Sequence, residues 1–549
     1  MDTRTFRRHA ARLRHPALRT AACAATLLAL PVASLAGASL AHAAGPPAAP
    51  SAAAPSTAPA FTQSVKAVSG TDTVQFSFTP AADNKDSRFV DVHYSVKGAP
   101  EGVQSFRMTR DHDGTWTWRA AVQNKDFQYW YTYADAHGGA VDTGKFDKDG
   151  NPEGGPVPPD GAGTFPLKID NPSGMDLYVT VVGQATPGHY SFLRPDGSLA
   201  AVYHPADPDG PDSDQKDGKG YPKMSMKLSD LGDGFTLPSH LEGSRIFLSD
   251  HPLYMDAAKN AAGNYDDSGY GQPDRHNPAD PNRDTRYDFF EYTFRNGKVA
   301  FGGNTTQVDG FSLPVKAELK QESSHFDRTV GIDGKTAADV IAAYRDSPVV
   351  GGPFKDLVDP SGTRITAPRS ATGFRDGGAA AHYFDPAIDK AWQKWADGFK
   401  MTDGDNVYRG RTTSGDGGAR LSYEKVRKEN GKETVVESGS VAKPSTADVA
   451  ACAGTLAQGT GTDKFVEAHL CAAFNRGVAL NDPATWNDAS TYYDRKSGVP
   501  FNDYAAFFHS ISIDGLAYAF AYDDVHDKSS VMILPNSGAP TGLTLTVNG

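Results

Sequence analysis

A segment rich in proline and glycine, residues 147–163 (DKDGNPEGGPVPPDGAG), constrains the fold more than any other feature of the chain. It offers few apolar side chains, and its Pro and Gly residues interrupt any strand or helix. It therefore predicts a linker between two folding units. A second linker, rich in Pro, Ala and Ser, occupies residues 44–60. The sequence thus predicts a small module at 61–146 and a large region at 164–549.

Residues 1–43 have the composition of a cleaved export signal. Arginines are concentrated at the start, an apolar run of Ala and Leu follows, and Ala41-His42-Ala43 forms an A-x-A cleavage site. A membrane anchor is the alternative reading, but Pro31 interrupts the apolar run. We therefore expect cleavage near Ala43 and a secreted protein.

The charge of the chain argues against two classes of partner. It has 54 Lys and Arg against 66 Asp and Glu, a formal net charge of −12 at pH 7, and no basic stripe follows the export signal. An acidic surface repels phosphate backbones and anionic lipids, so we expect neither nucleic acid nor a membrane as partner. We expect a monomer.

Two of the three cysteines, Cys452 and Cys471, remain after the signal is removed. An even pair in an exported protein predicts one disulfide, because the extracellular space is oxidising. Two thiols with a single nearby histidine are too few ligands for a structural zinc site.

The fold class expected is mainly β with an α/β part. Alternation at period two, broken by Gly and Asp turns, predicts a small β-sandwich with strands at 73–78, 89–96, 106–109, 115–120 and 127–133. The large region begins with strand patterns, which include 165–170, 177–182, 244–248, 289–294 and 311–318. Helical periodicity predicts helices at 336–344 and 386–399, the second capped by Asp385, and further helices at 448–456 and 463–474. Strand patterns return at 515–522 and 530–534.

This order predicts a β domain at about 164–330, completed by C-terminal strands at about 505–549. A mixed α/β insert at about 331–504 interrupts it.

Two carboxylates carry the clearest chemical signal in the large region. Glu291 lies in an alternating segment, where it shares a face with aromatic residues and Thr293, and Asp309 follows in the next expected strand. Such a pair can hydrolyse a glycosidic bond, because one acid protonates the leaving oxygen while the other activates water or attacks carbon. This chemistry needs no cofactor, and we expect none. The alternative for either residue is a surface acid on a half-buried strand.

The motifs around these acids carry a family resemblance. FFEYTF at 289–294, GNTTQVDGFSLPV at 303–315 and YYDRKSGVPFNDYAAFFHSISIDGLAYAFAYDD at 492–524 are similar to glycoside hydrolase family 64, the thaumatin-like β-1,3-glucanases. The resemblance implies a thaumatin-like β-sandwich or barrel domain and an α/β domain that flank a wide groove. It also implies inverting, endo-type hydrolysis that releases short β-1,3-glucooligosaccharides, pentaose in particular, from curdlan- or laminarin-like glucan.

The resemblance also implies roles for single residues. Glu291 would be the general acid and Asp309 the general base. Thr293 and Thr306 would bind sugar hydroxyls, with Asn304 as a further groove contact. Among other residues of these motifs, Asp523, Asp524 and His509 either line the cleft or hold the local structure. The rival function is a non-catalytic, thaumatin-like glucan-binding or antifungal protein that keeps the cleft without turnover.

The small module resembles carbohydrate-binding family 56, through VDVHYSV at 90–96, DGTWTW at 113–118 and YWYTYADAHGGAVDTGKF at 129–146. That resemblance implies binding of β-1,3-glucan. Alternation places Trp116 and Trp118 on one face, Tyr129 and Tyr131 on one face of the next strand, and Trp130 on the opposite face. We expect this aromatic set to contain both the core of the module and its glucan-binding side chains, without a sequence signal that separates them.

Overall fold

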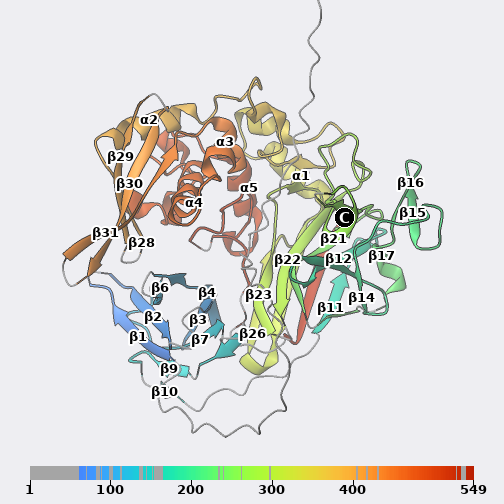
Figure 1. Ribbon diagram of the computed structural model, residues 1–549, viewed down its shortest axis with the longest axis horizontal. Helices are drawn as coiled ribbons and strands as arrows, with labels where there is room; N and C mark the ends of the chain where they lie inside the picture. The colour runs from blue at the N-terminus through green and yellow to red at the C-terminus, as the bar shows by residue number, and fades with distance from the viewer. Residues whose placement is uncertain are drawn as a thin grey trace, which may run out of the picture. The chain divides into compact units, whose positions relative to one another are not determined.

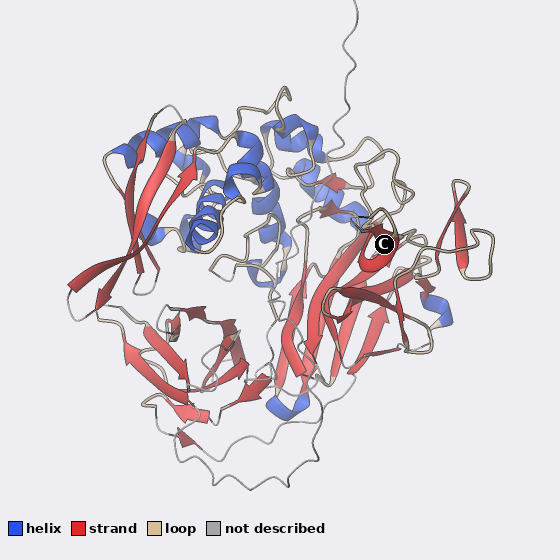
Figure 2. Ribbon diagram, in the orientation of Figure 1, coloured by secondary structure: helices blue, strands red, loops and turns tan. Residues whose placement is uncertain are grey.

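The computed structural model describes residues 61–549, apart from gaps at 70, 82–86, 88, 98–102, 112–113, 135–139, 144, 151, 154–164, 233–234, 239, 261, 296–297, 404–405, 416–417, 430–431, 527, 533 and 535–539. The predicted export signal at 1–43, the linker at 44–60 and most of the linker at 147–163 lie outside the described residues. The fold is mainly β, as the sequence predicts, and Figures 1 and 2 show its strands and helices.

The small module is a β-sandwich of two antiparallel sheets. One sheet has the order β1-β2-β6-β5, with β1 at Phe61–Ala67, β2 at Val74–Pro80, β6 at Trp116–Ala120 and β5 at Thr109–Arg110. The other has the order β10-β9-β7-β3-β4, with β10 at Pro152–Glu153, β9 at Lys145–Asp147, β7 at Phe127–Ala134, β3 at Val90–Val96 and β4 at Val103–Arg107, while β8 at Ala140–Asp142 pairs with β7. Aromatic rings from both sheets meet in the core, as in the pairs Phe76–Tyr129 and Phe78–Tyr131.

The β part of the large region is built on two sheets. The first has the order β18-β11-β32-β25-β26, with β18 at Phe235–Leu237, β11 at Phe165–Asp170, β32 at Gly542–Val547, β25 at Val315–Gln321 and β26 at Phe326–Gly331. The second has the order β14-β13-β12-β19-β22-β23, with β14 at Leu199–Ala201, β13 at His189–Leu193, β12 at Tyr178–Thr186, β19 at Leu241–Ser249, β22 at Tyr287–Arg295 and β23 at Lys298–Thr305. Short strand β17 at Met226–Lys227 pairs with β12.

Alternation along β22 determines which of its side chains point into the core between the two sheets and which point to the opposite face of the second sheet. Phe290, Tyr292 and Phe294 are buried in the core that both sheets share. The residues that alternate with them face the other way, where Tyr287 and Phe289 pack in a separate cluster and Glu291 is left partly exposed. Two antiparallel hairpins lie in the connections between the strands of this sheet. One pairs β15 at Ser213–Lys216 with β16 at Lys219–Pro222, and the other pairs β20 at Ala257–Lys259 with β21 at Tyr265–Tyr270.

The mixed part contains five α-helices among the described residues and a four-stranded antiparallel sheet. The helices are α1 at Ala337–Asp346, α2 at Asp385–Ala396, α3 at Thr446–Ala451, α4 at Thr462–Asn475 and α5 at Asp503–Ile511. The sheet has the order β28-β29-β30-β31, at Phe399–Asp403, Asn406–Thr413, Arg420–Glu429 and Lys432–Ala442. The predicted disulfide between Cys452 and Cys471 is confirmed, and it ties the end of α3 to α4. No helix among the described residues is long and apolar enough to cross a bilayer.

Four local predictions are wrong. Asp309 lies in a turn after β23 and not in a strand. Among the described residues of 530–534 only Met532 pairs, in an isolated bridge with Gly303, so this segment is not a regular strand.

Asp385 is not the cap of α2, because Phe384 occupies that position and the Asp385 carboxylate accepts a hydrogen bond from Thr446 Oγ1 at 2.8 Å instead. The segment 515–522 is not a strand. It follows a 3-10 turn at Ile513–Gly515, and the buried carboxylate of Asp523 accepts a hydrogen bond from the backbone N–H of Ala519 at 3.1 Å. That bond replaces the ladder hydrogen bonds that a strand would make.

Candidate active site

Glu291 lies on a strand with a neighbour on each side. In the register of β19, β22 and β23, Arg245 is opposite Glu291 on one side and Asn304 is opposite on the other. Residues directly opposite in antiparallel strands point to the same face of the sheet. The three side chains therefore form one row across the face that the shared core leaves free.

Arg245 holds the Glu291 carboxylate by one of its two oxygens. Arg245 Nε and Nη2 both approach Glu291 Oε1 at 2.9 Å. The guanidinium is itself fixed, because it donates to Gln272 Oε1 and stacks 4.4 Å from the centre of the Phe289 ring. Glu291 Oε2 makes no hydrogen bond within the described part of the chain. Charge-assisted bonds of this kind orient a carboxylate, which leaves Oε2 to face a ligand.

Asp309 belongs to a loop that a second, buried aspartate secures. Asp288 Oδ2 accepts hydrogen bonds from the backbone N–H groups of Ser312 at 2.7 Å and Leu313 at 2.6 Å. Arg275 lies 3.5 Å from the same carboxylate and donates to Ser312 Oγ at 2.9 Å. Burial raises the pKa of Asp288 to about 6, although Arg275 and the two N–H groups oppose the shift. The loop is thus held from beneath by groups that solvent does not reach.

Arg369 supplies the partner of Asp309 from a distant part of the sequence. Strand β24 at Gly310–Phe311 pairs with β27 at Ile365–Thr366, which brings the turn after β27 beside Asp309. Arg369 Nη1 lies 3.2 Å from Asp309 Oδ1. Both side chains are about one-third exposed, at 31% and 32%, so the pair remains open to a ligand. Each carboxylate of the predicted pair is therefore held by its own arginine.

The three predicted sugar-binding residues lie around these carboxylates. Asn304 is buried opposite Glu291, and its side-chain N–H donates to the carbonyl of Thr305 at 3.2 Å. Thr293 Oγ1 accepts from the backbone N–H of Gly243 at 3.0 Å. Thr306 is buried just after β23, where its hydroxyl accepts from the N–H of Val308 at 3.3 Å. The structure brings all three near the pair, and their contact with sugar stays a prediction.

The sequence did not single out the two arginines. Arg245 lies 46 residues before Glu291 in the chain. Arg369 is separated from Asp309 by the whole of α-helix α1 and follows a two-residue strand. Neither has a local motif, and only the strand pairings reveal them.

The aromatic residues of the small module divide into three groups. Trp116, Tyr129 and Tyr131 lie in the core, with exposed fractions of 6%, 0% and 0%, so their predicted role in stacking on sugar is wrong. Trp118 is half-buried at the margin of that core, where it stacks on Phe106 with ring centres 4.9 Å apart.

Trp130 points to the opposite face of its sheet, as alternation predicts, but it is only 3% exposed there and belongs to a buried polar cluster, so its predicted role in stacking on sugar is wrong as well. His93 lies beside it with ring centres 5.5 Å apart. The two imidazole nitrogens of His93 contact Ser105 Oγ and Thr132 Oγ1, both at 2.9 Å. Lys145 Nζ lies 4.8 Å from the centre of the Trp130 ring. Burial lowers the pKa of His93 to about 3, so its imidazole is neutral at ordinary pH.

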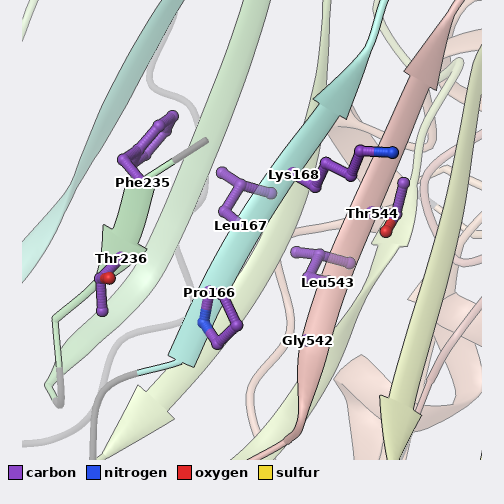
Figure 3. A pocket seen from close by; sticks show the side chains of 8 residues that line it. All are labelled: Pro166, Leu167, Lys168, Phe235, Thr236, Gly542, Leu543 and Thr544. Carbon is purple, nitrogen blue, oxygen red and sulfur yellow. The ribbon is translucent and has the colours of Figure 1, made fainter. Parts of the chain in front are cut away.

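Hollows also lie among the described residues of the large region, and two of them bear on the site. One of about 410 Å³ lies over β18, β11 and β32 and is lined by Pro166, Leu167, Lys168, Phe235, Thr236, Gly542, Leu543 and Thr544 (Figure 3). It has no carboxylate in its wall and is not the candidate active site. A second hollow of about 310 Å³ includes Arg369 and Arg375 in its wall, so it adjoins the partner of Asp309.

Comparison with known families confirms the two resemblances. Residues 163–547 match the family model of the β-1,3-glucanases of glycoside hydrolase family 64. Residues 63–143 match that of carbohydrate-binding module family 56. A glucan endo-1,3-beta-glucosidase from Cellulosimicrobium cellulans is 28% identical over 272 residues, which are 48% of this chain and 45% of that protein. The match thus spans about half the length of this curated relative.

Solved structures of the same kind are similar along most of the chain. A family 64 β-1,3-glucanase domain from Clostridium beijerinckii has 29% identity and a TM-score of 0.59, covering 71% of this chain and 100% of that structure. A family 64 laminaripentaose-producing β-1,3-glucanase from Paenibacillus barengoltzii, complexed with laminarihexaose, has 28% identity and a TM-score of 0.51. That comparison covers 89% of this chain and 99% of that structure.

Proposed function

Because the chain belongs to the β-1,3-glucanases of glycoside hydrolase family 64, we propose that it hydrolyses internal bonds of β-1,3-glucan. The proposed products are short β-1,3-glucooligosaccharides, with pentaose prominent among them, from curdlan- and laminarin-like substrates. The names of the relatives support this substrate, since they describe a glucan endo-1,3-beta-glucosidase and a laminaripentaose-producing β-1,3-glucanase.

One observation carries the proposal: two carboxylates, Glu291 and Asp309, are each fixed by an arginine at one oxygen and keep the other oxygen for chemistry. In the proposed reaction Glu291 protonates the glycosidic oxygen while Asp309 takes a proton from the attacking water. The bond from the anomeric carbon to the leaving oxygen breaks as the bond to water forms, so the configuration inverts. No cofactor enters these steps.

We further propose that the protein is exported and that its small module attaches it to insoluble glucan. The signal at 1–43 supports export, and the match of residues 63–143 to a carbohydrate-binding family supports attachment. A tethered catalytic region meets its substrate at a high effective concentration, even if each site binds weakly. Trp118 is the proposed glucan contact of the module, because it is the aromatic residue of the predicted set that is not buried, and an indole face suits a sugar ring.

The test incubates the mature protein with curdlan and follows products by mass spectrometry and by NMR of the anomeric protons at early times. We expect short β-1,3-oligosaccharides that first appear as the α-anomer. Glu291→Gln and Asp309→Asn should each lose at least about 100-fold in kcat. Glu318→Gln is the matched control, because Glu318 is a strand carboxylate that pairs with Lys320.

Each alternative result has a defined meaning. Full activity in the Glu291→Gln/Asp309→Asn double variant would reject the assigned pair. Absence of products from a protein that still sediments with curdlan would identify the non-catalytic glucan-binding protein instead.

A further inference from the structure

The C-terminal segment of the large region runs along the loop that carries Asp309. The backbone N–H of Gln307 donates to the carbonyl of Tyr518 at 2.8 Å, and Tyr504 donates through its hydroxyl to the carbonyl of Gln307 at 2.6 Å. Further along, Ser530 Oγ donates to the carbonyl of Thr305 at 2.8 Å. These bonds place the backbone of Tyr518 against Gln307, two residues before Asp309 in the chain.

The phenol of Tyr518 interacts electrostatically with Glu291 and with Arg369, the partner of Asp309. Its side chain is partly exposed, and its hydroxyl has no hydrogen-bond partner within the described part of the chain. Burial raises the pKa of Tyr518 well above its usual value. The charges of Asp524, Glu291 and Asp523 act in the same direction, and Arg369 opposes them. The phenol is therefore within electrostatic reach of Glu291 and of the arginine that pairs with Asp309, and it stays protonated.

A buried ionic cluster fixes the segment that carries this phenol. Arg476 and Asp523, at 1% and 0% side-chain exposure, lie 3.3 Å apart, and Asp523 Oδ2 contacts His509 Nε2 at 2.9 Å. Arg476 Nη2 also donates to the carbonyls of Asp523 and Val525, both at 2.9 Å. The other imidazole nitrogen of His509 contacts the carbonyl of Gly515 at 2.7 Å. The cluster thus holds both sides of Tyr518 to α4 and α5.

The three buried ionisable groups add little net stability, because the cost of their desolvation offsets most of the attraction between them. The cluster does, however, specify one path for the segment. From its position we propose that Tyr518 is a substrate-binding residue of the active site, donating a hydrogen bond from its phenol to a glucan hydroxyl beside the bond that is cleaved. Arg476, Asp523 and His509 are its positioning residues. This inference rests on the proposed β-1,3-glucanase function.

The first experiment replaces only the hydroxyl, in the full-length mature protein, and measures hydrolysis of laminarihexaose. Tyr518→Phe should lower kcat/KM by about 10- to 100-fold, the range expected for one hydrogen bond that strengthens in the transition state. Its thermal unfolding should match that of the wild type, because the hydroxyl has no partner in the protein. Tyr522→Phe is the matched control, since Tyr522 belongs to the same segment and its phenol is near Glu467. We expect its kcat/KM to stay within about twofold.

A binding measurement separates this inference from the function on which it rests. Calorimetry compares laminarihexaose binding to Glu291→Gln and to Glu291→Gln/Tyr518→Phe, and neither variant needs turnover. The second variant should bind at least about fivefold more weakly. Equal affinities, or a Tyr518→Phe enzyme with wild-type kcat/KM, would overturn the role of Tyr518. A wild-type protein that releases no sugar would instead reject the proposed function, and the calorimetry would still decide the role of Tyr518.

The positioning role is tested by a double-mutant cycle with Asp523→Asn. If Asp523 acts by placing Tyr518, the loss in kcat/KM of Asp523→Asn and that of Tyr518→Phe should not multiply in the double variant. Losses that multiply would show that Asp523 acts independently of Tyr518 and would overturn its positioning role. His509→Gln removes only one arm of the cluster and takes the place of Asp523→Asn if that variant fails to fold.

Discussion

We predict that replacing His93 with Gln makes the small module less sensitive to acid. His93 is fully buried, and its pKa is lowered to about 3 by burial first and by the charge of Arg107 second. In the unfolded chain the same histidine has a pKa of about 6.5. As pH falls below about 6.5 the unfolded state takes up a proton that the folded state refuses, so the folded state loses stability.

The size of this loss follows from the two pKa values. Linkage gives a loss of about 1.4 kcal/mol near pH 5.5 and about 2.7 kcal/mol near pH 4.5. A small domain has a total stability of about 5 to 15 kcal/mol, so the second figure is a substantial share. Asp91 acts in the opposite direction, because burial raises its pKa and it contributes stability that is lost as pH rises. Because Asp91 is present in both proteins, the contribution of His93 is the difference in pH-dependent stability between the wild type and the His93→Gln variant.

Scanning calorimetry of the full mature chain at several pH values between 7 and 4.5 measures that difference. Gln can still contact Ser105 and Thr132 but takes up no proton, so its unfolding temperature should depend less steeply on pH. Adsorption to curdlan and hydrolysis of laminarihexaose are measured at the same pH values. We expect wild-type adsorption to weaken in acid before hydrolysis does, and the variant to retain adsorption longer. Equal pH dependence of unfolding in the two proteins would refute the reasoning.

Three further predictions concern the large region. Arg369→Gln should reduce kcat by about tenfold in steady-state kinetics, with Arg375→Gln as the control. Its free energy of unfolding should change by less than about 1 kcal/mol, because the ion pair between Arg369 and Asp309 is partly exposed. Asp288→Asn should lower both kcat and the unfolding temperature, since it weakens the hold on the Asp309 loop and leaves the buried charge of Arg275 without its carboxylate partner. In the wild type, the folded state should lose stability as pH rises from about 4 to about 6, because Asp288 ionises in the unfolded chain before it does so in the fold. Asp288→Asn should remove this pH dependence, and unfolding measured across that range checks it. Replacing Cys452 and Cys471 by Ser opens a loop with a sequence separation of 19 and should cost about 3 kcal/mol in denaturant unfolding.

Much of the fold could be predicted because the relevant signals are local. Strand β11 occupies the predicted residues 165–170. Helix α1 begins after Thr336, whose side chain forms a reciprocal capping box with Asp339. In each case residues within one turn or one strand determine the structure.

The predictions that failed depended on contacts between distant residues. Alternation in the module shows which aromatic side chains share a face, but it does not show which face meets the core, and so Tyr129 and Tyr131 could be taken for binding residues. The segment 515–522 alternates like a strand, yet the buried carboxylate of Asp523 binds the backbone of Ala519, and Arg476, which follows α4, binds the carbonyl of Asp523. The sequence shows that Asp523 and Arg476 are present, but it does not show that they lie next to each other in the fold.

The register of β19 shows how little of the active site is local. Arg245 faces Glu291 only because the pairing shifts between Leu241 and Ser244, which inserts a bulge into β19. Gly243 lies in this bulge with a φ of 53°, and its N–H donates to Thr293 Oγ1. A one-residue slip would turn every side chain of the strand to the opposite face and would remove the guanidinium from Glu291. The threonine two residues after the predicted acid therefore fixes the arginine that orients that acid, a role that its place in the motif alone does not reveal.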